Sequence, residues 1–589
     1  MSLSRRTLAC LSLFCVSASL SACGSSGSNE DNATGDTSAD GSGSTDATTA
    51  GEESSSGETS AETTGDGDGD GDGDGDSAYC DDLDHPVAEF QSEGGNDWGE
   101  VAGDFTVETT FGTFTLSERW TGCDSYIIVH DLGDGTAGQL FNTATAELFT
   151  RSALNTHYFF VNDNADPEAR ALQWQGQIGA AIGAVGDEEL KAWWAEHVHF
   201  VTQSPANIQG SLGTFLQANP SVRGIGIDRG QRWDNLGSHS DVTSTFVPML
   251  SVFGYVSRWY NFRHAQDLHL ADTSGVTVVP IIDGVTFSPD CVPGEGCFDT
   301  QNGPFSNSNN NAIWTATFPD AATMANFDEL EIVVSATCGP DSYSDCGHWD
   351  YEAFVDLCED ETCSAVRGEF ARWITPYSRP GRRTWVIQGS PLLGMLAAGG
   401  EQHFRFSMIW NMNPSTWTIE ARLRDTGAAK VSETLLVHRQ NTGFNAGYND
   451  SFAPFDFTPP AGTTKVELVS IISGHGQSAG TNCAEWCNHV HEFTLNDAAS
   501  HTRSFPNQVG GKNCAERVDE GVVPGQWGNW TPGRAGWCPG LPVQPWVVDI
   551  TDDVTIGSSN TLTYQASYGG ADPSTDGRIR ITNYVVYYE

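Results

Sequence analysis

The sequence predicts a multidomain protein in which an α/β domain precedes two antiparallel β-sandwich domains. The chain of 589 residues is too long for one hydrophobic core. From about residue 104 to residue 242, segments typical of strands alternate with segments typical of helices. From about residue 277 onward, short strand-like runs are separated by Gly, Pro, Asn and Asp turns, in two blocks of sandwich size. A cleft between the sandwiches is the natural place for a site.

The N-terminal stretch is typical of a bacterial export signal. Arg5 and Arg6 precede an apolar run from residue 8 to residue 20, which is too short to span a bilayer as a mature helix. The run ends in Leu-Ser-Ala-Cys at Cys23, which resembles the bacterial lipobox. We expect residues 1–22 to be a lipoprotein signal peptide. The mature protein would then be lipid-anchored to the outer membrane of the cell envelope, on its periplasmic or cell-surface side.

Residues 23–79 are predicted to be a disordered acidic linker. This segment contains no Lys or Arg, and Gly alternates with Asp from residue 65 to residue 76. It has too few apolar residues to form a core, and its charges repel one another. A calcium-binding repeat is the alternative, but the spaced apolar positions of such repeats are missing. The net charge of −49 excludes general nucleic-acid binding through phosphates.

The α/β domain is expected to span residues 80–275. Its first half resembles the thioredoxin-like group, in which a phrase like Asp104-Phe-Thr-Val precedes the central strand, here residues 126–129. The redox cysteines of that group follow this strand, but residues 130–135 contain no cysteine. We therefore expect a degenerate scaffold or a partner-binding role instead of thiol chemistry. The expected strands cover residues 105–116 (a hairpin), 126–129, 157–161, 197–201 and 224–227, and the expected helical segments cover residues 140–154 and 187–196.

The two β-sandwich domains are expected at residues 276–428 and 429–589. Their expected strands include residues 313–318, 330–334, 384–387, 404–410 and 417–421 in the first block, and 465–472 and 579–588 in the second.

The cysteines indicate a disulfide-rich exported protein. Of fifteen cysteines, Cys10, Cys15 and Cys23 belong to the signal and the lipid site, so an even number remains in an oxidising compartment. Zinc is the competing use of close cysteines, although the repeated spacing of zinc ribbons is missing. The spacing favours the pairs Cys291–Cys297, Cys338–Cys346, Cys358–Cys363, Cys483–Cys487 and Cys514–Cys538, and Cys80–Cys123 follows by elimination.

The stretch from Cys346 to Leu357 is the first candidate for a site. It joins a cysteine-closed loop to a strand-like run, along which side chains alternate between faces. Asp350 and Glu352 would therefore share one face. For an isolated acidic residue, a solvated strand surface is the ordinary explanation, and the motifs further along the chain favour a functional role for Asp350.

Five motifs together resemble the peptide:N-glycosidase F family over roughly residues 300–589. They are residues 346–357, Arg372-Trp-Ile-Thr-Pro-Tyr377, Ile472-Ser-Gly-His-Gly476, Cys483-Ala-Glu-Trp-Cys487 and the segment 529–540, which reads Asn-Trp-Thr-Pro-Gly-Arg-Ala-Gly-Trp-Cys-Pro-Gly. The resemblance implies two eight-stranded jelly rolls with an active site at their interface. It also implies hydrolysis of the amide between N-acetylglucosamine and asparagine in N-linked glycoproteins or glycopeptides, with no metal or other cofactor.

The resemblance also implies roles for individual residues. Asp350 corresponds to the principal catalytic carboxylate, and Glu485 to a second carboxylate that acts through a bound water. Trp410 and Arg534 correspond to substrate-contacting residues, and we expect Trp486, Trp537 and Tyr377 to bind substrate as well. Disulfides of the family match Cys338–Cys346, Cys483–Cys487 and Cys514–Cys538. A proton donor at the departing nitrogen and a positioned water are what amide hydrolysis requires.

The chain departs from the family pattern at three positions. Met408 replaces an acidic residue, Tyr351 replaces an arginine, and His475 replaces a tryptophan. Two other functions therefore stay open. One is a non-catalytic glycan-binding or adhesion lipoprotein. The other is a copper-dependent monooxygenase, because peptidylglycine hydroxylating enzymes share the paired jelly-roll architecture, although the sequence has no adjacent His pair and no Met-X-His phrase.

Overall fold

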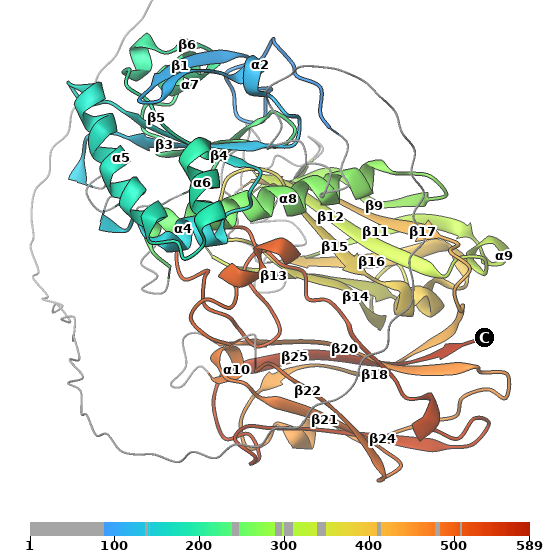
Figure 1. Ribbon diagram of the computed structural model, residues 1–589. Coiled ribbons are helices and arrows are strands. Elements are labelled where there is room, and N and C mark those ends of the chain that lie inside the picture. Colours follow the sequence, from blue (N-terminus) through green and yellow to red (C-terminus); the bar gives the residue numbers. More distant parts are fainter. Residues whose placement is uncertain are drawn as a thin grey trace, which may run out of the picture. The chain divides into compact units, whose positions relative to one another are not determined.

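The computed structural model describes residues 87–135, 140, 142–237, 247–288, 297–299, 310–338, 349–408, 414–476, 483–506 and 509–589 (Figure 1). The predicted signal peptide, linker and lipidated Cys23 lie outside these residues, as do Cys80, Cys291, Cys346 and Trp410. Within them, no helix combines the length and apolar character needed to cross a membrane.

The first part of the chain forms a mixed α/β structure, as predicted. Its five-stranded sheet has the order β5-β4-β3-β7-β8. Strands β3, β4 and β5 run parallel to one another, and β7 pairs antiparallel with both β3 and β8. The strands are β3 Ser125–Asp131, β4 Thr156–Asn162, β5 Val198–Phe200, β7 Gly224–Ile227 and β8 Trp233–Asn235. A three-stranded sheet is formed by β1 Phe105–Thr109, β2 Gly112–Thr115 and β6 Gln209–Gly210. The helices are α2 Leu116–Arg119, α4 Ala146–Arg151, α5 Pro167–Gly183, α6 Glu188–His197, α7 Ser211–Ala218 and α8 Val252–Ala271, with short 3-10 turns η1 Pro205–Asn207 and η2 Met249–Ser251.

Local signals explain several of these elements. Every residue of β3 is buried, because Ile127 packs into one hydrophobic core and Ile128 into another. Helix α5 starts at Pro167 behind Asp166, whose carboxylate accepts the Ala169 N–H. Long helices α5 and α8 were not among the elements expected from the sequence.

The next part is a β-sandwich of a five-stranded sheet, β10-β9-β17-β12-β15, and a four-stranded sheet, β11-β16-β13-β14. Both sheets contribute to one hydrophobic core, in which Trp373, Trp385 and Trp417 lie close together. Every pair of neighbouring strands is antiparallel except β9 and β10. The elements are β9 Thr277–Ser288, β10 Cys297–Asp299, β11 Asn310–Asp320, α9 Ala321–Met324, β12 Glu329–Cys338, β13 Glu352–Cys358, β14 Val366–Ile374, β15 Arg383–Gln388, η3 Ser390–Leu396, β16 Gly399–Met408 and β17 Ser415–Arg424.

The C-terminal part is a second antiparallel sandwich, of sheets β18-β25-β20-β23 and β19-β24-β21-β22 around their own core. The prediction of two β-sandwiches after an α/β part is therefore confirmed. The elements are β18 Val431–Gly443, η4 Asn449–Ser451, β19 Phe455–Phe457, β20 Lys465–His475, α10 Cys483–Trp486, β21 Val490–Leu495, β22 Ala499–Ser504, η5 Ala515–Glu520, β23 Trp546–Asp549, η6 Thr551–Asp553, β24 Asn560–Ser567 and β25 Arg578–Tyr588.

The segment between β22 and β23 contacts the α/β part. Its residues Ala515, Val518 and Trp530 share a hydrophobic core with α8 and the five-stranded sheet. Arg151 Nη1 of α4 also bonds Glu516 Oε2 of η5 at 2.8 Å. The loop that carries the motif at residues 529–540 is thus supported by residues from the beginning of the chain.

Three disulfides occur among the described residues, Cys358–Cys363, Cys483–Cys487 and Cys514–Cys538. These are three of the pairs expected from the spacing. Cys123 and Cys338 are also disulfide-bonded, and the partners expected for them, Cys80 and Cys346, lie outside the described residues.

Candidate active site

Asp350 lies in the loop just before β13, two residues earlier than the strand begins. The loop is attached to the end of β14, because Thr375 N–H donates to Tyr351 O at 2.9 Å and Tyr351 N–H donates to Thr375 Oγ1 at 2.8 Å. Burial alternates from Asp350 into the strand, so Asp350 and Glu352 share a face, and Tyr351 points into the core. Only 12% of the Asp350 side chain is exposed.

Tyr377 connects Asp350 to the motif at residues 529–540. Its hydroxyl lies 2.7 Å from Asp350 Oδ2 and 2.8 Å from Asn529 Oδ1. Since a phenol has one proton, it donates to one of these oxygens at a time. Arg534 Nη2 donates to the same hydroxyl oxygen at 3.1 Å and lies 3.5 Å from Asp350 Oδ2. Asp350 Oδ1 forms no hydrogen bond to another residue in the described part of the chain.

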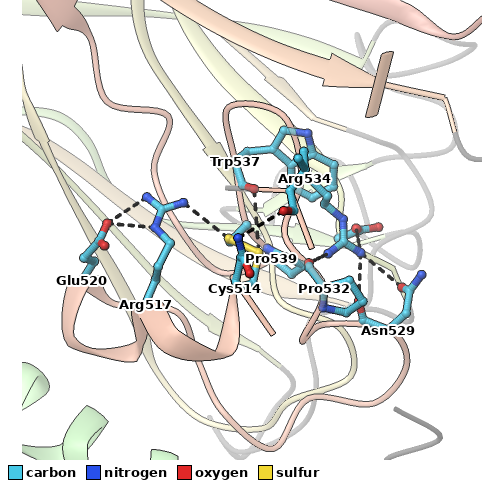
Figure 2. Close-up of a disulfide and its surroundings, with 12 residues drawn as sticks. Cys514, Arg517, Glu520, Asn529, Pro532, Arg534, Trp537 and Pro539 are labelled. Atoms are coloured by element: carbon cyan, nitrogen blue, oxygen red, sulfur yellow. Dashed lines mark hydrogen bonds and ion pairs between the residues drawn. A yellow bond between two sulfur atoms is a disulfide. The ribbon is translucent and has the colours of Figure 1, made fainter. Parts of the chain in front are cut away.

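Arg534 is the buried centre of the group, with no exposed surface. Its Nε donates to Glu485 Oε1 at 3.3 Å, and its Nη1 donates to Pro532 O at 2.8 Å. The guanidinium carbon lies 4.5 Å from the Trp486 ring centroid and 4.8 Å from that of Trp537. Figure 2 shows Arg534 between Trp537 and Asn529. One buried cation therefore faces both candidate carboxylates.

Glu485 is held in the short helix α10, which the Cys483–Cys487 disulfide closes. Its Oε2 accepts the Gly476 N–H at 3.0 Å, and its backbone carbonyl accepts the Ala535 N–H at 2.8 Å. Gly474 must be glycine, because a Cβ there would lie 1.7 Å from Ala484 O. The Glu485 side chain is 5% exposed, so its position is closely determined.

The electrostatics of the group favour a protonatable Asp350. Burial raises the pKa of Asp350 to about 6, and the Glu485 charge adds to this effect; Arg534 and the Tyr377 hydroxyl oppose it. Burial, opposed in part by Arg534, also raises the pKa of Tyr377, which stays a proton donor. By contrast, His475 and Arg580 hold the pKa of Glu352 below its usual range against the effect of burial. The two carboxyl groups on one strand face thus have different environments.

The other residues expected at the site differ in how far their side chains are exposed. Trp486 is half-buried, whereas Trp537 is 3% exposed and donates its Nε1–H to Gly474 O at 2.6 Å. Arg534 and Trp537 therefore have no open face for a substrate, because protein atoms cover them. Trp410, expected to contact the glycan, lies outside the described residues.

Asn529 is a site residue to which the sequence analysis assigned no role. It belongs to the recognised motif, but only the structure shows that its side chain contacts both Arg534 and Tyr377. In the described part of the chain, no group of three or more His, Cys, Asp or Glu side chains is placed to hold a metal.

Part of the sequence matches known proteins. Residues 444–586 match the family model described as peptide-N-glycosidase F, C terminal. A relative from Elizabethkingia miricola, peptide-N(4)-(N-acetyl-beta-D-glucosaminyl)asparagine amidase F, is 33% identical over 133 residues. This match covers 22% of the present chain and 35% of the relative, about a third of its length.

Solved structures give weaker likenesses. A crystal structure of peptide-N(4)-(N-acetyl-beta-D-glucosaminyl) asparagine amidase covers 53% of this chain and 96% of that chain, with 20% identity and a TM-score of 0.41. A structure of PNGF-II covers 55% and 67%, with 11% identity and a TM-score of 0.41. The sequence matches show that the C-terminal segment of this chain is similar to the peptide-N-glycosidase F family.

Proposed function

We propose that the protein is a peptide-N4-(N-acetyl-β-glucosaminyl)asparagine amidase that acts on N-linked glycoproteins or glycopeptides. The observation that carries the proposal is the group formed by Asp350, Tyr377, Glu485 and Arg534. Glu485 and Arg534 lie within the segment that matches the family model, and a relative that is 33% identical over 133 residues is named for this activity.

The residues suit hydrolysis of an amide. The oxygen of a water molecule bonds to the side-chain carbonyl carbon of the glycosylated asparagine, and the carbon–nitrogen bond breaks. The water loses a proton and the departing nitrogen gains one, so the reaction consumes no net proton. Asp350 acts as the acid or base that transfers a proton in this reaction, because its pKa of about 6 lets both protonation states exist near neutral pH. Its Oδ1 is the oxygen that forms no hydrogen bond to another of the described residues.

Glu485 orients the attacking water in this proposal. Among the described residues, its Oε2 accepts one hydrogen bond from Gly476 and its Oε1 accepts one from Arg534. A carboxylate oxygen can accept a second hydrogen bond, so a water can bind without displacing either partner. Arg534 acts as a positioning residue, since it is buried and holds both carboxylates.

The proposal extends to the finer features expected from the sequence. The two sandwiches correspond to the pair of eight-stranded jelly rolls of the family, the first having the short parallel strand β10 in addition. The α/β part is a thioredoxin-like scaffold without redox cysteines. The reaction uses no metal or other cofactor. Anchoring of the mature chain at Cys23 to the outer membrane stays a prediction.

The test is mass spectrometry of a defined N-glycopeptide incubated with the full chain. The wild type should release the glycan and convert the asparagine to aspartate, whereas Asp350→Ala should not. Asp425→Asn is the matched control, because this carboxylate is exposed and far along the sequence from the site. Absence of turnover with high-mannose, complex and core-fucosylated substrates, together with retained glycan binding, would favour the non-catalytic alternative.

A further inference from the structure

The Asn529 side chain has a determined orientation in the candidate site. Arg534 Nη2 lies 3.2 Å from its Oδ1, and because a guanidinium can only donate, the atom facing it must be the amide oxygen. The Tyr377 hydroxyl oxygen lies 2.8 Å from the same amide oxygen, to which it donates when its proton is not directed at Asp350. Figure 2 shows the amide nitrogen of Asn529 turned away from Arg534.

The amide nitrogen is available for a ligand. Asn529 Nδ2 has no hydrogen-bond partner within the described part of the chain, and Asn529 is half-buried next to the exposed Trp527. Asn529 Oδ1 and Asp350 Oδ2 both lie within one hydrogen-bond length of the Tyr377 hydroxyl oxygen. One hydroxyl group therefore bridges Asn529 and the candidate acid, so the two side chains are neighbours in the site.

Amide hydrolysis needs a donor of this kind. Attack by water places negative charge on the carbonyl oxygen, which donors in a preorganised site stabilise. Glu485 accepts hydrogen bonds from Gly476 and Arg534. Arg534 is fully buried and donates to Glu485, to Pro532 O and to the Tyr377 hydroxyl. Donation from Arg534 to the Asn529 oxygen also polarises the Asn529 side-chain amide. The Nδ2–H groups of Asn529 therefore become stronger hydrogen-bond donors.

We propose that Asn529 is a further catalytic residue, whose Nδ2–H donates to the carbonyl oxygen of the scissile amide as negative charge develops there. This inference rests on the proposed amidase function. It assigns to Asn529 a contact with the reacting atoms, in addition to its bonds with Arg534 and Tyr377.

The experiment compares an N-glycopeptide with its analogue in which sulfur replaces the carbonyl oxygen of the linking amide. Sulfur is a weaker hydrogen-bond acceptor, so the ratio of the two rates depends on the donor. We expect Asn529→Ala to lower kcat about 100-fold with little change in KM, and to shrink the oxygen-to-sulfur rate ratio at least about tenfold relative to the wild type.

Asn529→Asp separates the donor from the anchor. The aspartate keeps an oxygen for Arg534 and Tyr377 but lacks the N–H groups. Asn529→Asp should therefore shrink the oxygen-to-sulfur rate ratio as Asn529→Ala does. If the wild type cleaves the oxygen substrate and both variants keep the wild-type rate ratio, Asn529 only supports the fold and the inference is overturned. If the wild type does not cleave the oxygen substrate at all, the proposed function itself fails.

Discussion

Replacing Tyr377 by Phe should raise the pKa of Asp350. The hydroxyl donates to Asp350 Oδ2 at 2.7 Å and so favours the ionised carboxylate. A hydrogen bond to a charged group contributes about 1.5–3 kcal/mol, and one pKa unit corresponds to about 1.4 kcal/mol. Because Asp350 already titrates near 6, we expect the variant to titrate between about 7 and 8.

The assay is the pH dependence of kcat/KM, whose limbs report the titrating groups of the free enzyme. The limb assigned to Asp350 should move to higher pH whether the residue acts as acid or as base. Glu485→Gln is the opposing control, because removal of a neighbouring negative charge should move the same limb to lower pH. Infrared difference titration of the protonated carboxyl band, assigned with Asp350→Asn, gives the same pKa without turnover. An unchanged or lowered pKa in Tyr377→Phe would refute the reasoning.

Three further predictions concern the support of the site. A chelator should leave turnover unchanged; loss of activity that zinc or calcium restores would contradict the metal-free mechanism. Cys483→Ser with Cys487→Ser should lower kcat/KM by about tenfold to a hundredfold, since Glu485 loses its ring, with the far-ultraviolet circular dichroism as a check that the fold persists. Arg534→Met should reduce the unfolding free energy by about 3–5 kcal/mol, because two poorly exposed carboxylates lose their cation. A melting temperature equal to that of the wild type would argue against this role.

The sheet regions were predictable because their strands contain apolar runs that end at turn residues. In β7 and in the centre of β20 such a run is buried continuously, and the sequence shows it directly. Helix α8 was missed for a physical reason. The residues from Val252 to Val256 are all buried. The first part of the helix therefore has no polar face and shows no helical period.

The site was predictable only in part. The motifs name Asp350, Glu485 and Arg534, but the sequence separates the first from the last by most of the β-rich region. Their approach depends on the loop around residues 529–540, which packs against the α/β part. Trp537 is buried in the hydrophobic core of the first sandwich, and Arg534 is buried against Trp486 and Trp537, and neither burial has a local signal in the sequence. For that reason the sequence suggested substrate contacts where the structure shows support.

The three departures from the family pattern are Tyr351, Met408 and His475. Tyr351 points into the core of the first sandwich and is 6% exposed, as is Met408, so neither replacement places a new group beside Asp350 Oδ1. His475 keeps an aromatic ring stacked on Trp537, with centroids 5.3 Å apart. Its Nε2 also lies 3.2 Å from Glu352 Oε1. His475 thus packs on the Trp537 ring beside Arg534, and Tyr351 and Met408 fill the core of the first sandwich. The effect of the three replacements should fall on glycan preference more than on the positions of the two carboxylates.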